Sequence, residues 1–228
     1  MNTKRTTFAT LILLLLLLTG PVFGAGPEAA KMVSDKTGSE LIKEFSEALY
    51  KRDHIRMSHV VEKNMAIVSM EANALCDAAL APGVPDEERE AVFYVLERLA
   101  TAYRNATGDQ SLLEGLKKRM FESRLSPATA SSKAGDFYVV ESIAKGASQV
   151  SLSPDNIIIK SGETVRWVNR NTVAQQLASV MSPMGRKEIL SPVIEPGKGW
   201  EHTFYVPGEY YYITLPNKVL YGKVVVTE

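Results

Sequence analysis

The spacing of apolar positions changes once along the chain, from a helical period to a strand period. Residues 39–125 carry apolar side chains at steps of three and four, which is typical of helices that pack through one face. After residue 136 apolar and polar side chains alternate, which is typical of half-buried strands. We therefore expect two domains: an all-α helical bundle over 25–125 and an all-β sandwich over 136–228.

The helical half predicts three or four antiparallel helices. Apolar positions 61, 65, 68, 72, 75 and 79 form one seam, so we expect them on a single helix. The sequence Ala81-Pro82-Gly83 ends that helix, and Pro85 with the acidic residues after it opens the next one. The pattern leaves open whether a break near Asp53 separates the first two helices.

Residues 126–135 consist of Ser, Pro, Ala, Thr, Lys and Gly, a composition typical of a linker. Beyond this stretch, short alternating segments separated by turn residues predict the strands of a sandwich or barrel. The expected strands span residues 137–143, 148–152, 156–160, 164–169, 176–181, 188–194, 199–205, 209–214 and 222–227.

Four motifs in this second half occur in the order found in small blue-copper proteins. They are Ser153-Pro154-Asp-Asn-Ile157, Gly162-Glu-Thr-Val165-x-Trp167, Phe204-x-x-x-Gly208-x-Tyr210 and Gly222-Lys-Val-Val-Val226. The chain therefore resembles the cupredoxin superfamily, which includes plastocyanins and amicyanins. The resemblance implies a two-sheet Greek-key sandwich and leaves the helical half unexplained.

The segments that carry the copper ligands in that family lack every ligand here. The resemblance places Gln175 and Asn217 at the two ligand histidines, Thr214 at the ligand cysteine and Leu220 at the axial methionine. A type 1 site uses two imidazoles, a thiolate and a weak thioether, so we expect no copper and no other cofactor in this domain. Tyr221 lies beside Leu220 and adds contact area, so we expect these five positions to form a protein-binding surface.

His54, Met57 and His59 are the residues outside this region that suggest metal chemistry. Imidazole and thioether ligands suit copper or haem iron. The two histidines are five residues apart, which does not place them on one helix face, and the ordinary alternative is that all three are helix surface residues. They nevertheless define the alternative function, a copper-handling or electron-transfer accessory protein with its metal outside the type 1 position.

Two further side chains have a structural interpretation. The single cysteine, Cys76, excludes an intrachain disulfide and is expected to pack as a small hydrophobe, with a reactive thiol or an intermolecular disulfide as the alternative. His202 shares strand spacing with Trp200 and Phe204, so we expect it on their core face. The same alternation predicts that, within residues 210–212, the middle tyrosine points away from its two neighbours.

The start of the chain predicts export. Lys4 and Arg5 precede an apolar run over residues 8–19, and small residues follow at a suitable distance, as in a signal peptide over 1–24. The run is shorter than the ~20 residues of a spanning helix, although a retained anchor is the alternative. We expect a periplasmic or secreted protein that begins near Ala25, has no membrane span after cleavage and binds a protein partner.

Composition and spacing argue against two function classes. Basic and acidic residues number 26 each, so the chain has no basic excess of the kind that nucleic-acid binding requires. No Ser-His-Asp, Cys-His or paired-carboxylate arrangement can be assembled from the spacing of residues, so we do not expect an enzyme.

Overall fold

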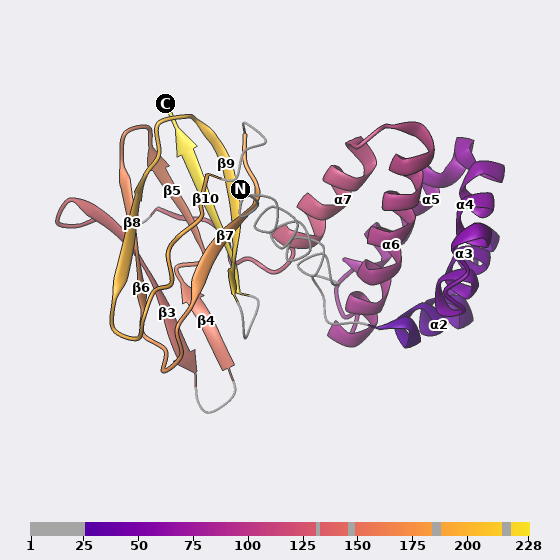
Figure 1. The fold of residues 1–228 in the computed structure, drawn as a ribbon, viewed down its shortest axis with the longest axis horizontal. Helices are drawn as coiled ribbons and strands as arrows, with labels where there is room; N and C mark the ends of the chain where they lie inside the picture. Colours follow the sequence, from indigo (N-terminus) through magenta and orange to yellow (C-terminus); the bar gives the residue numbers. More distant parts are fainter. Residues whose placement is uncertain (1–25, 131–132, 146–148, 184–187, 216–219) are drawn as a thin grey trace, which may run out of the picture. The chain divides into compact units, whose positions relative to one another are not determined.

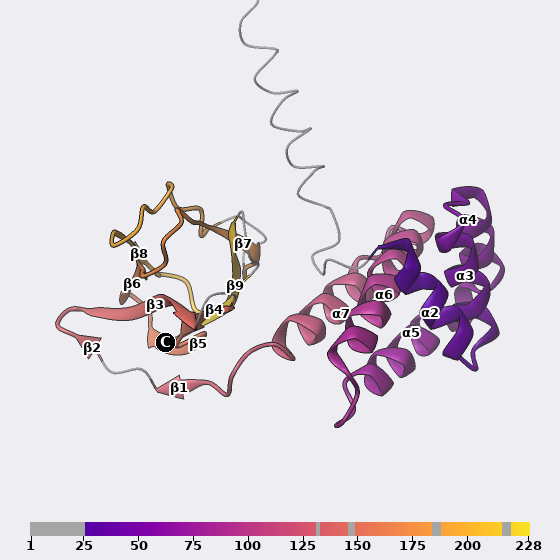
Figure 2. The ribbon, with the colours of Figure 1, turned by 90° about the horizontal axis from the view of Figure 1, so that it is seen from below.

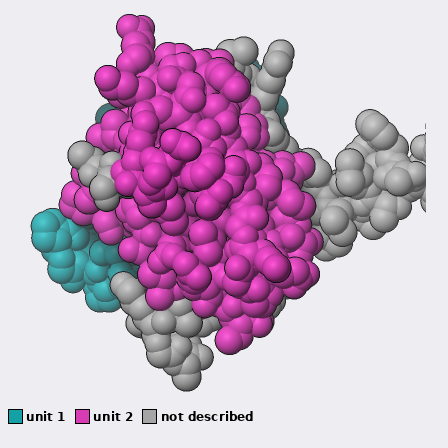
Figure 3. Space-filling view, turned by 90° about the vertical axis from the view of Figure 1, so that its left-hand side faces the viewer, with its two compact units in different colours: residues 1–123 teal, residues 124–228 magenta. Residues whose placement is uncertain are grey.

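The computed structural model describes residues 26–130, 133–145, 149–183, 188–215 and 220–228, in two compact units that divide after Ser123. The first unit is helical and the second is built from strands (Figure 1). Figure 3 colours the two units teal and magenta. This order confirms the predicted fold class. The predicted signal peptide, 1–24, lies outside the described residues. Within the described ranges, every helix is too short or too polar to cross a membrane.

The described part of the first unit contains more helices than the three or four predicted. They are α2 (Pro27–Lys36), α3 (Glu40–Tyr50), α4 (His54–Lys63), α5 (Met65–Ala79), α6 (Asp86–Thr107) and α7 (Ser111–Glu122). Helix α2 precedes the region with helical spacing. It buries small side chains, Ala29, Ala30, Val33 and Ser34, which give a weak apolar pattern.

Two polar residues, Asp53 and Asn64, mark the breaks between consecutive helices in this unit. The Asp53 carboxylate accepts a hydrogen bond from the Arg56 N–H at 2.9 Å and caps α4, so a break at Asp53, which the sequence pattern left open, separates α3 from α4. A second break lies at Asn64, whose side-chain amide donates to the Val60 carbonyl at 2.8 Å. The prediction of one helix over residues 61–79 is therefore wrong, because apolar spacing does not register a side chain that binds the backbone at a helix end.

Helix α6 is the central helix of this unit and contacts α2, α4, α5 and α7 (Figure 2). Its residues 91–96 are all buried, because neighbouring helices cover it on several sides. It ends at Gly108, which has the left-handed φ of 77° that a helix C-terminus commonly requires. Residues of α6 also line two grooves of this unit.

The second unit is a sandwich of two sheets. One sheet has the order β1-β5-β10-β9-β7; the other has the order β2-β3-β6-β8, with β4 also paired to β3. The strands are β1 (Thr129–Ala130), β2 (Lys133–Ala134), β3 (Phe137–Lys145), β4 (Gln149–Ser153), β5 (Asn156–Lys160), β6 (Thr164–Asn169), β7 (Gln176–Met181), β8 (Gly199–Thr203), β9 (Gly208–Leu215) and β10 (Tyr221–Thr227). The predicted strand over 188–194 instead makes isolated bridges to the β7 region.

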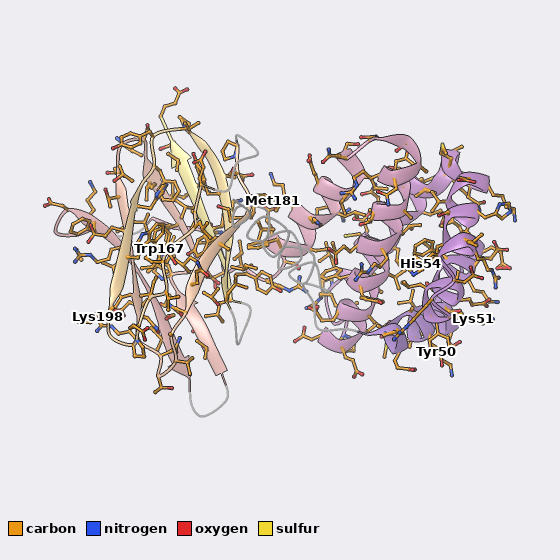
Figure 4. The ribbon with its side chains drawn as sticks, viewed as in Figure 1. Tyr50, Lys51, His54, Trp167, Met181 and Lys198 are labelled. Atoms are coloured by element: carbon orange, nitrogen blue, oxygen red, sulfur yellow. The ribbon has the colours of Figure 1, made fainter. Side chains whose placement is uncertain are left out.

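The core of the sandwich is organised around the buried Trp167 (Figure 4). The Trp167 ring centroid lies 5.4 Å from that of Trp200, 5.5 Å from that of Tyr212 and 6.3 Å from that of Phe204. His202 stacks on Trp200 at 5.6 Å and meets Phe204 edge-on at 4.7 Å, which confirms that these residues share a face. Partial burial lowers the pKa of His202 and favours its neutral form.

The stretch over 126–135 is expected as a linker, but its described residues, 126–130 and 133–135, take part in the sandwich. Strand β1 pairs in parallel with β5, and β2 pairs with β3. The backbone N–H and the hydroxyl of Ser126 each donate to the Asp155 carboxylate at 3.1 Å, and the Asn156 amide donates to the Ser126 carbonyl at 3.1 Å. Backbone pairing does not require apolar side chains, so the composition of this stretch gave no sign of it.

Candidate functional site

Three of the four positions that the sequence resemblance assigns to copper ligands lie at one end of the sandwich. Gln175 immediately precedes β7, and Thr214 lies near the end of the neighbouring β9, where it pairs with Leu177. Leu220 immediately precedes β10. Asn217 lies outside the described residues.

Thr214 and Leu220 close the loop between β9 and β10 on itself. The Thr214 N–H donates to the Leu220 carbonyl at 3.1 Å, and the Leu220 N–H donates to the Thr214 hydroxyl at 3.2 Å. Thr214 is buried, and the Leu220 side chain packs against the core of the sandwich. The Thr214 hydroxyl, at the position that the resemblance assigns to the ligand cysteine, therefore accepts a backbone hydrogen bond, and Leu220 helps to fill the core.

The chain before β7 is held against residues 193–194 by a single buried side chain. The Asn169 amide donates to the Val173 carbonyl at 2.9 Å and to the Ile194 carbonyl at 2.8 Å. Gln175 and Ile194 also exchange backbone hydrogen bonds of 3.1 and 2.7 Å. These bonds place Val173 close to residues 193–194, beside Gln175.

Three exposed apolar side chains lie in the segments that these backbone contacts join. They are Val173, Leu190 and Val193, which are 48%, 58% and 60% exposed. The backbone of Leu190 bridges Ala178 on β7. Sequence patterns do not single out these residues. Val173 lies between two expected strands, and the strand expected over 188–194 does not indicate that Leu190 and Val193 are exposed.

The tyrosines near this end are already engaged. Tyr221 is half-buried, and the Arg124 guanidinium lies 5.1 Å from its ring centroid. Tyr211 is buried; its hydroxyl donates to Glu209 at 3.0 Å, and the Lys223 ammonium lies 5.0 Å from its ring centroid. The neighbouring tyrosines at 210 and 212 belong to the core and Tyr211 does not, as the alternation predicts, but Tyr211 is buried as well and is not an exposed outer residue.

His54, Met57 and His59 separate on α4. Met57 is buried in the helical core, and the two histidines are exposed. His54 and Met57 line a groove of about 700 Å³ with Glu62, whereas His59 lines a shallow depression of about 480 Å³ with His54 and Glu62. Over the described ranges, no three His, Cys, Asp or Glu side chains converge as a metal site requires.

Cys76 lies on α5 and is fully buried. Burial raises the pKa of its thiol, which the nearby Arg119 charge only partly opposes. A protonated, buried thiol is a poor nucleophile and packs as a small apolar side chain.

Comparison with known proteins finds a protein that is similar to part of this chain. No family model matches the chain. The chain is 28% identical over 97 residues to amicyanin of Paracoccus denitrificans, an alignment that covers 42% of this chain and 71% of amicyanin. A match that also covers 42% of this chain is to the reduced Cu(I) form of an amicyanin mutant at pH 4, with 86% of that chain covered, 28% identity and a TM-score of 0.35.

A purple cupredoxin from Nitrosopumilus maritimus is also similar. It is 24% identical, and the match covers 39% of this chain and 98% of that one, with a TM-score of 0.32. The aligned length in the amicyanin comparison is close to that of the strand-built unit. The C-terminal unit is therefore a cupredoxin-like, two-sheet sandwich with amicyanin as a relative.

Proposed function

We propose that this chain is an exported, non-enzymatic protein whose copper-free cupredoxin-like domain serves as a binding or scaffold module. Export rests on the signal-peptide pattern over residues 1–24. The likeness to amicyanin supports a domain of the electron-carrier type rather than an enzyme. The residues at the ligand positions then separate this chain from the copper proteins it resembles.

The observation that carries the proposal is the use made of Thr214. In a type 1 site this position supplies a thiolate, whereas here its hydroxyl accepts the Leu220 N–H at 3.2 Å. Leu220 offers no donor atom, and its side chain packs against the core. Gln175 offers a neutral amide in place of an imidazole. This set of side chains does not fit type 1 copper.

Binding rests on the surface beside those positions. Val173 and Val193 expose apolar area close to Gln175, Leu190 exposes more beside Ala178, and Tyr221 adds a half-buried ring near Leu220. Clustered exposed apolar side chains with a polar surround are typical of protein-protein contacts. We infer that a periplasmic or extracellular protein docks over this surface.

The copper part of the proposal is tested by metal loading. The mature protein is incubated with Cu(II), dialysed and analysed for metal and visible absorbance, with amicyanin treated in parallel as the positive control. We expect no intense thiolate-to-copper band from this chain. One tightly held copper per chain with a blue or purple band would contradict the proposal.

The binding part is tested by affinity capture from the native periplasm with paired variants. We expect Val173→Ser with Val193→Ser to reduce capture about tenfold or more, because apolar anchors dominate such interfaces. Ile158→Ser is the matched control, since Ile158 is an exposed apolar residue on β5. If the folded double variant captures the partner as well as the parent does, while Tyr221→Ala captures it less well, the interface lies at Tyr221. If neither variant reduces capture, this end of the sandwich is not the interface.

A further inference from the structure

The helical unit contains an open groove, and all of its lining residues belong to that unit. It has a volume of about 700 Å³ and lies between the α3–α4 connection and α6, with His54 on one wall (Figure 4). The residues of its lining that bear on binding are Leu49, Arg52, Met57, Glu62, Arg98 and Ala102. Volumes of this order and a mixed apolar and polar lining are typical of small-molecule sites.

Cationic charge predominates in this groove. Arg52 and Arg98 supply two guanidinium groups, against one carboxylate from Glu62. Arg98 lies over the Tyr94 ring, 5.6 Å from its centroid. Within the described residues, neither guanidinium forms an ion pair with a carboxylate.

The second groove of the helical unit is different in this respect. It has a volume of about 370 Å³, and its cation, Lys36, is already paired with Glu88 at 2.9 Å. Glu71 adds a further carboxylate to its lining. Charge therefore distinguishes the two grooves, and the one lined by Arg52 and Arg98 is suited to an anion.

The backbone at Arg52 gives a second, independent observation. Arg52 has a φ of 56°, and it is the non-glycine residue with positive φ among those described. Its N–H bonds the Leu49 carbonyl at 3.1 Å, and the Asp53 N–H bonds the Ala48 carbonyl at 2.9 Å. This is the hydrogen-bond pattern of a helix terminus at which glycine is the usual residue. The chain thus keeps a guanidinium where local backbone conformation favours glycine.

We propose that this groove binds a small amphipathic anion, with a carboxylate or phosphate head group between Arg52 and Arg98. Guanidinium groups bind both head groups through charge-assisted hydrogen bonds. The buried side chains of Leu49 and Met57, with Ala102, form an apolar floor for the tail. The same two cations oppose binding of a copper ion by His54 and Met57, so the groove takes an anion in place of the metal that those residues suggest.

The test is calorimetric titration of the full mature chain with four probes that share an octyl chain. Octanoate and octyl phosphate carry the anion, octanol is neutral and octylammonium is cationic. We expect at least one anionic probe to bind about tenfold or more tightly than octanol, with octylammonium weakest, because hydrogen bonds to charged groups contribute that order of discrimination. Equal binding of octanol and both anions would overturn the proposal.

Two variants then assign the head group to these residues. Arg98→Gln and Arg52→Gly should each weaken binding of the anionic probe about tenfold. Arg52→Gly should leave the melting temperature unchanged or raise it, because glycine suits a φ of 56°. A loss of binding without a loss of stability separates recognition from folding.

Arg56→Gln is the matched control, since Arg56 pairs with Glu47 at 3.5 Å and does not line the groove. Its binding of the anionic probe should equal that of the parent. Unchanged affinity in both Arg52→Gly and Arg98→Gln would overturn the proposal. So would tight binding of Cu(II) that is lost in His54→Ala, because a cation site at these residues is incompatible with an anion site.

Discussion

Gly222 and Tyr212 face each other across the antiparallel pair of β10 and β9, and the tyrosine ring covers the glycine. A Cβ atom at residue 222 would lie 2.2 Å from Cζ of Tyr212 and 2.4 Å from its hydroxyl oxygen. The ring cannot move aside freely, because it is fully buried and meets Trp167 edge-on at 5.5 Å. The glycine is therefore required by a close approach between neighbouring strands.

Gly222→Ala should lower the free energy of unfolding by about 1–3 kcal/mol, the usual effect of overpacking a core. Urea unfolding followed by tryptophan fluorescence measures it, since both tryptophans lie in the sandwich. Gly115→Ala on α7 is the control, because a Cβ there meets nothing within 4 Å and alanine favours a helix interior. Equal stability of Gly222→Ala and the parent would show that the ring is free to move.

The second prediction concerns the closed loop between β9 and β10. Thr214→Val keeps the shape of the side chain but removes the hydroxyl that accepts the Leu220 N–H. It should lower the free energy of unfolding by about 1 kcal/mol, because a partly buried donor loses its partner. Thr214→Ser keeps the oxygen and should retain the loop. Comparable losses in both variants would show that the methyl group, rather than the hydrogen bond, matters.

Much of this fold follows from the sequence, and the exceptions share a physical cause. The change of apolar period predicts two units, and strand alternation predicts the orientation of Tyr211 relative to its neighbours. The pattern does not reveal α2, whose buried face consists of small residues, nor the break at Asn64. These features depend on backbone hydrogen bonds and small side chains, which leave little trace in hydropathy.

The candidate site can also be predicted from the sequence only in part. The order of the motifs predicts that Gln175, Thr214 and Leu220 lie at one end of the sandwich, because each position lies in or next to a strand of the same sheet. It does not identify Val173 and Val193 as exposed neighbours, since their proximity depends on the Asn169 amide binding two separate carbonyls. Nor does spacing reveal that Arg52 and Arg98 line one groove, because helix packing brings them together.

The third prediction concerns alkaline pH. Burial, together with the Glu188 charge, raises the pKa of Tyr210 to about 12. The unfolded chain releases this proton near pH ~10, so the folded state binds more protons between these values. Stability should therefore be insensitive to this group below about pH 10 and fall as the pH rises from there toward 12.

Tyr210→Phe tests this assignment in urea unfolding at several alkaline pH values. The variant loses the hydrogen bond from the Tyr210 hydroxyl to the Val206 carbonyl, which is 2.6 Å long, so its stability should fall by about 1 kcal/mol at neutral pH. Its loss of stability with rising pH should be shallower than that of the parent. Tyr205→Phe, which alters an exposed tyrosine, is the control and should leave the slope unchanged. A parallel slope in Tyr210→Phe would assign the alkaline loss to another group.

The last prediction concerns where the sandwich begins. A fragment over residues 124–228 should unfold at higher urea concentration than one over 136–228. The longer fragment keeps β1 on the edge of β5 and β2 on β3, together with the bonds between Ser126 and Asp155. Each retained hydrogen bond contributes about 1 kcal/mol, and an edge strand that stays covered is less prone to association.

Ser126→Ala in the longer fragment is the specific control for this boundary. It removes the hydroxyl bond to Asp155 but keeps the Ser126 backbone N–H and both short strands, so it should lower stability by about 1 kcal/mol. If the fragments over 124–228 and 136–228 unfold at the same urea concentration, residues 124–135 contribute no stability to the sandwich. They then behave as the linker that their composition predicts, despite the strand pairs they form.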